Sequence, residues 1–182
     1  PYPIIALDYD GNKAWGGLAR WHAGFMARHG DYLYVVNDAD VRPARSARQL
    51  EEPSTIELIQ LDPATGMEVP WPDRNSKHKI AEWSVAEQGT SRKWEGWTVE
   101  HHAHDADWAG CNAQGLTALG DRLYLSLHHE DKLLVIDPAV GEAVGEIPVV
   151  DPAGIVSDGR RLLVVSGTRV VGLGACGVYE AL

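Results

Sequence analysis

The sequence predicts an all-β protein in which short strands form repeated antiparallel sheets. Residues 115–148 show why, because they hold four short apolar runs with no room for a helix between them. Apolar and polar residues alternate within these runs, as in half-buried strands. Asp137-Pro138 suits the start of a turn, and Gly141 supplies a positive φ just after it. We name the four runs a, b, c and d and expect them to pair in that order as an antiparallel meander.

Both tight turns of this meander recur along the chain. The a–b turn and the start of strand b occur at 30–35, 120–125 and 159–165. The c–d turn occurs at 7–11, 61–66 and 136–141. The a–b glycines Gly120 and Gly159 are 39 residues apart. This spacing is close to the roughly 40–50 residues of one propeller blade, so the repeat predicts part of a β-propeller of four-stranded antiparallel blades.

The elements then follow in order within one propeller-like domain, 1–182. We expect a half-blade of strands c and d, a first full blade, a second full blade and a partial third blade. Their expected bounds are 3–22, 24–70, 114–150 and 153–178. A short helix is possible at 76–88. A β-sandwich with similar hairpins is the alternative, and the equal repeat spacing favours the propeller.

The motifs Gly120-Asp-x-Leu-Tyr-Leu-Ser126 and Leu134-Val-Ile-Asp-Pro-x-x-Gly141 resemble blades of the broad β-propeller superfamily. This superfamily includes the NHL, YVTN and quinoprotein-type repeats, and the resemblance covers most of the chain outside 71–112. It implies a fold more than a function, since members include metal-dependent lactonases, quinone-cofactor dehydrogenases and pure binding modules. Propellers usually have about 4–8 blades. We therefore expect a longer chain, a protein partner or further copies to supply the missing blades.

The composition excludes several function classes. The net charge of −10 argues against binding of nucleic acid or an anionic membrane. No run approaches the roughly 20 apolar residues of a membrane helix. Two cysteines are too few for a disulfide scaffold and lack metal-site spacing. The acidic pI near 5.2 and the elaborated loops fit a periplasmic or extracellular protein.

Two long insertions are expected at the same end of the sheets. From the a–b glycine to the c–d turn, the first blade has 32 residues against 17 in the second. The added residues lie around 37–54, between strands b and c. A larger insertion, 71–112, lies between strand d and the next strand a. These two kinds of connection share one rim in a meander, and long loops in compact domains are often functional.

Aromatic and basic residues gather in the insertions. Five of the seven tryptophans lie in 71–112, either as a small core for the insertion or as a platform for a sugar or partner protein. The arginines around position 45 either clamp an anionic group or are solvated. We take these residues as candidates for ligand or partner binding: His22, His101, Trp94, Trp97, Trp108, Arg42 and Arg45.

Histidines and carboxylates also concentrate on the insertion side. Imidazole and carboxylate ligands suit a divalent transition metal. Two ligands from one loop and a third from the b–c hairpin of the second blade would leave a coordination position open for catalysis. The candidate metal ligands are His102, His104, His128, His129, Asp105 and Asp107. The alternatives are that these side chains are solvated or that a His/Asp pair performs acid–base chemistry.

These features support two functions of different classes. The first is a binding and assembly module that uses the elaborated rim to hold a partner or ligand. The second is an exported metal-dependent enzyme, similar to the lactonases or oxidoreductases of the superfamily. Whether the chain is an enzyme is left open by the sequence, and so are the catalytic residues.

Overall fold

The computed structural model describes residues 2–20, 25–38, 54–83, 113–166, 169–174 and 177–180. Within these residues the chain is all-β apart from one short 3-10 helix, η2, and no helix is long and apolar enough to cross a membrane. The first strands are β1 (Tyr2–Leu7), β2 (Lys13–Arg20), β3 (Phe25–His29), β4 (Tyr32–Asp38), β5 (Ser54–Leu61) and β6 (Lys77–Trp83). They are followed by β7 (Ala113–Leu119), β8 (Arg122–Leu127), η2 (His128–Glu130), β9 (Lys132–Asp137), β10 (Glu142–Pro148), β11 (Pro152–Ser157), β12 (Leu162–Ser166), β13 (Arg169–Gly174) and β14 (Gly177–Glu180).

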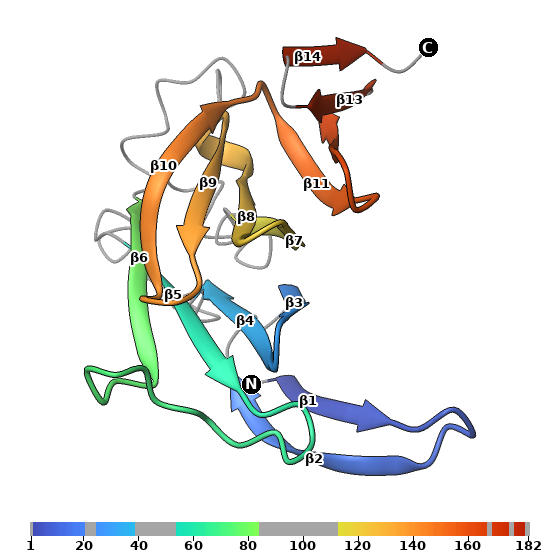
Figure 1. Ribbon diagram of the computed structural model, residues 1–182, viewed down its shortest axis with the longest axis vertical. Helices are drawn as coiled ribbons and strands as arrows, with labels where there is room; N and C mark the ends of the chain where they lie inside the picture. Colours follow the sequence, from blue (N-terminus) through green and yellow to red (C-terminus); the bar gives the residue numbers. More distant parts are fainter. Residues whose placement is uncertain are drawn as a thin grey trace, which may run out of the picture.

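The strands form one two-stranded and three four-stranded antiparallel sheets (Figure 1). β1 and β2 form the half-blade, and β3–β6, β7–β10 and β11–β14 form blades 1, 2 and 3. Each four-stranded sheet pairs its strands in chain order, as expected for a meander. The a–b turn glycines Gly30, Gly120 and Gly159 have φ values of 55°, 62° and 85°, which L-residues with a Cβ rarely adopt.

The three sheets are arranged as propeller blades. The first strand of blade 2, β7, packs against the first strands of both neighbours, β3 and β11. The sheets therefore fan out from the side where these three strands lie, as Figure 1 shows. This arrangement, with consecutive meanders and inner first strands, confirms the predicted partial β-propeller.

Blade 1 differs from the expectation in its last strand. The hairpin predicted at Gly66 is present, because the N–H of Asp62 donates to the carbonyl of Met67 at 2.9 Å. Pairing then stops at Pro70, which has no N–H to donate, and resumes where Lys77 lies opposite Ile59. Strand d is thus completed by β6. The segment 76–88, which could have held a short helix, forms strand β6 over 77–83, so these residues of the segment 71–112 belong to the blade 1 sheet.

Blade 3 is also larger than expected. The sequence indicated a partial third blade, whereas β11, β12, β13 and β14 form a complete four-stranded sheet. The second strand pairs with the third along its whole length, from Leu162 opposite Leu173 to Ser166 opposite Arg169. Strand β14 has only four residues, which is too few to show a clear alternation of apolar residues.

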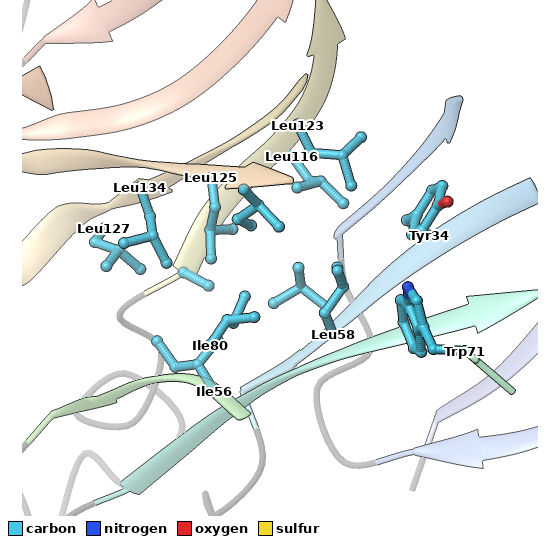
Figure 2. Packing of buried hydrophobic residues seen from close by; sticks show 13 residues of the cluster. Tyr34, Ile56, Leu58, Trp71, Ile80, Leu116, Leu123, Leu125, Leu127 and Leu134 are labelled. Carbon is cyan, nitrogen blue, oxygen red and sulfur yellow. The ribbon is translucent and has the colours of Figure 1, made fainter. Parts of the chain in front are cut away.

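The core lies between the blades, so the middle strands are buried on both faces. On β4, Val36 belongs to the cluster between blades 1 and 2, whereas its neighbour Val35 packs with Ile59 toward the half-blade. In Figure 2, Leu58 and Ile80 of blade 1 lie on one side of the first of these clusters, and Leu116 and Leu125 of blade 2 lie on the other. Burial on both faces explains why these strands are apolar at consecutive positions.

A tryptophan clamps each of the first two junctions between sheets. Trp15 of the half-blade donates its indole N–H to the carbonyl of Pro63 in the c–d turn of blade 1, at 2.9 Å. Trp71 of blade 1 makes the same bond, also 2.9 Å, to Pro138 in the c–d turn of blade 2. Each of these hydrogen bonds joins one sheet to the Asp-Pro turn of the next. The repeated turn therefore reverses the chain and also accepts a hydrogen bond from the neighbouring sheet.

The a–b turn of blade 3 provides a pH-dependent prediction. The backbone N–H groups of Arg160 and Arg161 donate to Asp158 Oδ1 at 2.8 and 2.7 Å. These bonds, followed by the side chain of Arg161, lower the pKa of Asp158 from 3.8 to about 2. Because the folded pKa lies below the unfolded one, the turn's contribution to stability is fully present above pH ~4 and is lost as the pH falls toward 2.

A titration of the Asp158 carboxyl carbon by NMR measures this pKa directly. We expect a midpoint near pH 2, and a midpoint at the ordinary value of 3.8 would contradict the turn geometry. In Asp158→Asn the stability of the protein should depend less on pH below pH ~4.

Candidate functional site

The ends of strands β5 and β6 show which end of the blade 1 sheet carries the two insertions. Within blade 1, β5 begins where β6 ends, since Ser54 lies opposite Trp83. The b–c connection, 39–53, and the d–a connection, 84–112, therefore leave blade 1 at the same end. We call this end the insertion rim and the opposite end, which carries the a–b and c–d turns, the turn rim. The connections themselves lie outside the described residues.

Most of the predicted ligand and partner residues belong to undescribed segments. His22, Arg42, Arg45, Trp94, Trp97, His101, His102, His104, Asp105, Asp107 and Trp108 all lie outside the described residues. The structure describes only the backbone of His129, and of the candidates it places the side chain of His128 alone. Within the described part of the chain there is no group of three or more His, Cys, Asp or Glu side chains arranged to hold a metal.

His128 lies on the insertion rim beside a carboxylate. The helix η2 ends at Glu130, and the next residue, Asp131, has a left-handed φ of 50°. The carbonyl of Asp131 accepts the N–H of Val149, and its Oδ1 accepts the N–H of Asp151 at 2.7 Å. These bonds hold the β8–β9 and β10–β11 connections together. As a result Oδ1 of Asp151 lies 2.9 Å from Nδ1 of His128, and the pair is half-buried.

A groove of about 520 Å³ lies on the turn rim, between blades 1 and 2. It is formed by the a–b turns of both blades and the c–d turn of blade 2. It is lined by His29, Gly30, Asp31, Tyr32, Tyr34, Asp121, Arg122, Asp137, Pro138 and Ala139. A smaller adjoining pocket extends along Gln60 and Trp71.

Aromatic side chains form the blade 1 wall of the groove. The Tyr34 hydroxyl donates to Gln60 Oε1 at 3.1 Å and lies 3.5 Å from the carbonyl of Pro138. Its ring is 6.3 Å from that of Trp71, which in turn lies 4.6 Å from His78. Figure 2 shows Tyr34 and Trp71 next to each other at the end of the blade 1–blade 2 core. The wall is therefore continuous with the core.

The blade 2 wall is charged. Nη1 of Arg122 lies 3.2 Å from a carboxylate oxygen of Asp121 and 3.2 Å from one of Asp137. The groove also raises the pKa of Tyr34 to about 12, first through burial and then through the nearby Tyr32 and Asp137. The Tyr34 hydroxyl is therefore protonated at neutral pH and keeps its hydrogen for the bond to Gln60.

Sequence reasoning missed this groove. Its residues come from three short turns that are far apart in the chain, and short turns were taken as connections only. One signal was present: a tryptophan follows each of the first two c–d turn glycines closely, Trp15 after Gly11 and Trp71 after Gly66. This repeat marks the junctions between blades, and the groove lies at the second junction.

The comparisons with known proteins concern the fold. No family model and no curated protein matches the chain. It is similar in structure to BamB from Moraxella catarrhalis and to hydrazine synthase from Kuenenia stuttgartiensis. BamB is 14% identical with a TM-score of 0.49, over 94% of this chain and 39% of that one. Hydrazine synthase is 13% identical with a TM-score of 0.44, over 86% and 35%. The chain spans less than two-fifths of each.

Proposed function

We propose that this chain is a propeller-type binding and assembly module. The observation that supports this proposal most directly is the exposed apolar surface on the outer face of the half-blade. Ala6 and Trp15 are paired, and Trp15 packs against blade 1. Because side chains alternate along a strand, Ile5 and Leu7 point to the opposite face, where they are 52% and 62% exposed. In a propeller this face would be covered by another blade.

The half-blade also offers a sheet edge. Within the described residues β1 pairs only with β2, so its other edge is available for backbone hydrogen bonds with added strands. We propose that strands from a partner protein or a further copy of this chain pair with β1 and cover Ile5 and Leu7. The insertion rim, with Trp94, Trp97 and Trp108, would extend the contact to the partner.

Light scattering coupled to size-exclusion chromatography tests assembly by copies. We expect the 182-residue chain to form species larger than its 19.9 kDa monomer, and Ile5→Lys/Leu7→Lys to shift them to the monomer. Val144→Lys is the matched control, because Val144 is 53% exposed on the outer strand β10, and it should leave the assembly unchanged. A monomer at every concentration, with β1 amides unprotected from hydrogen exchange, contradicts the proposal.

A second candidate is a metal-dependent exported enzyme, and the position of His128 favours it. A histidine that ligates a metal through one ring nitrogen usually has its other nitrogen next to a carboxylate or carbonyl. Nδ1 of His128 has such a neighbour in Asp151, at 2.9 Å. We propose that His102 and His104 of the adjoining insertion join His128 in binding zinc or a similar divalent metal.

Elemental analysis of the purified protein distinguishes the two candidates. For the enzyme we expect about one zinc, copper, iron or manganese per chain, and His128→Ala should remove most of it. His29→Ala is the matched control, because His29 lies on the opposite rim and should not affect the metal content. Metal-free protein, or equal metal loss in both variants, overturns the metal site.

A further inference from the structure

The turn-rim groove carries excess negative charge. Three carboxylates line it, from Asp31, Asp121 and Asp137, against the single guanidinium of Arg122. Arg122 already pairs with the second and third of these. Asp31 forms no ion pair with any other described residue. The groove therefore has two uncompensated negative charges, and a cationic ligand would be attracted to it.

An exposed aromatic ring, that of Tyr32, lines the groove together with these carboxylates. Tyr32 is 37% exposed and meets Tyr34 edge-on, with ring centroids 6.4 Å apart and an interplanar angle of 79°. Since Tyr34 is fixed by its bond to Gln60, it supports the position of Tyr32. The electron-rich faces of tyrosine rings attract cations, most strongly where the cation is partly desolvated.

We propose that this groove binds the side chain of an arginine presented by a peptide. The planar guanidinium stacks on aromatic rings and pairs with carboxylates, whereas the lysine ammonium is a more strongly hydrated point charge. Arg122 already occupies Asp121 and Asp137, so Asp31 is the carboxylate left to pair with the incoming guanidinium. The volume of about 520 Å³ also leaves room for the residues that flank the arginine. This site lies on the rim opposite the insertions and is independent of the proposed assembly.

Isothermal titration of the 182-residue protein with a capped Gly-Arg-Gly peptide tests the site. The matched ligand is Gly-citrulline-Gly, which keeps the shape of arginine without its charge. We expect the citrulline peptide to bind at least about tenfold more weakly, since it loses the attraction to both the carboxylates and the rings. Tyr32→Ala and Asp31→Asn should each weaken binding of the arginine peptide by about three- to tenfold.

Asp10→Asn serves as the control variant, because Asp10 is also an exposed turn carboxylate but lies in the half-blade, outside the groove lining. Its affinity for the arginine peptide should equal that of the wild type. Circular dichroism confirms that each variant is folded. No binding of the arginine peptide at millimolar concentration, equal binding of the citrulline peptide, or equal weakening by Asp10→Asn would overturn the proposal. Tighter binding of a neutral disaccharide than of the peptide would overturn it as well.

Discussion

Replacing Trp71 by alanine is expected to lower the free energy of unfolding by about 3–5 kcal/mol. The ring is 4% exposed and fills the space between Tyr34 and His78 at the junction of blades 1 and 2. Its indole N–H is also the donor to Pro138. The truncation therefore opens a cavity and removes an inter-blade hydrogen bond at once. Urea unfolding followed by circular dichroism measures the loss.

Trp71→Phe separates these two contributions. Phenylalanine keeps most of the apolar ring but cannot donate to the Pro138 carbonyl, so we expect it to cost about 1–2 kcal/mol, close to the value of one buried hydrogen bond. If Trp71→Ala costs no more than Trp71→Phe, the ring does not fill the junction as described. The assembly through the half-blade should be the same in both variants, because Trp71 lies away from Ile5 and Leu7.

The turns were predictable because their chemistry is local. A glycine that must adopt a positive φ is visible in the sequence without knowledge of its neighbours, and Gly120 and Gly141 have φ values of 62° and 70°. The strands that these turns join follow directly, since a tight turn between two apolar runs allows only an antiparallel pair. The repeat of the turns then predicted the stacking of sheets.

The outer strand of blade 1 was not predictable in the same way. Pairing across β5 and β6 resumes only after the segment from Pro70 to Ser76, so the partner of Ile59 is Lys77 rather than a residue next to the Gly66 turn. No local pattern encodes such an interruption. The alternation around Ile80, which is buried, is too short to distinguish a strand from one helical turn.

The candidate sites show the same contrast between features that are encoded locally and features that depend on residues distant in sequence. The turn-rim groove brings together residues such as Tyr32 and Arg122 that are remote in sequence, and their proximity depends on how two blades are spaced. Sequence patterns report the faces of a strand but not the distance between sheets. The histidine-rich insertion was recognisable from composition alone, and its metal site stays a prediction because only His128 of its side chains is placed.

Gly66→Ala is expected to destabilise the protein by about 2–5 kcal/mol, well above the cost of the same change at another turn. Gly66 has a φ of 70°, and a Cβ there would overlap the Trp15 ring, 2.9 Å from its Cδ2 atom and closer still to Cε3. The left-handed backbone costs about 1–2 kcal/mol for alanine, and crowding in a packed site adds about 1–3 kcal/mol. The indole cannot move aside without losing its bond to Pro63.

Gly120→Ala is the matched control, since its φ of 62° is similar and a Cβ there meets no atom within 4 Å. It should show only the backbone cost of about 1–2 kcal/mol. A double-mutant cycle with Trp15→Ala completes the test. Once the ring is absent, Gly66→Ala should cost no more than Gly120→Ala, because only the backbone strain is left. If the cost of Gly66→Ala is the same with and without the Trp15 ring, the ring does not hold the half-blade to blade 1 through this turn.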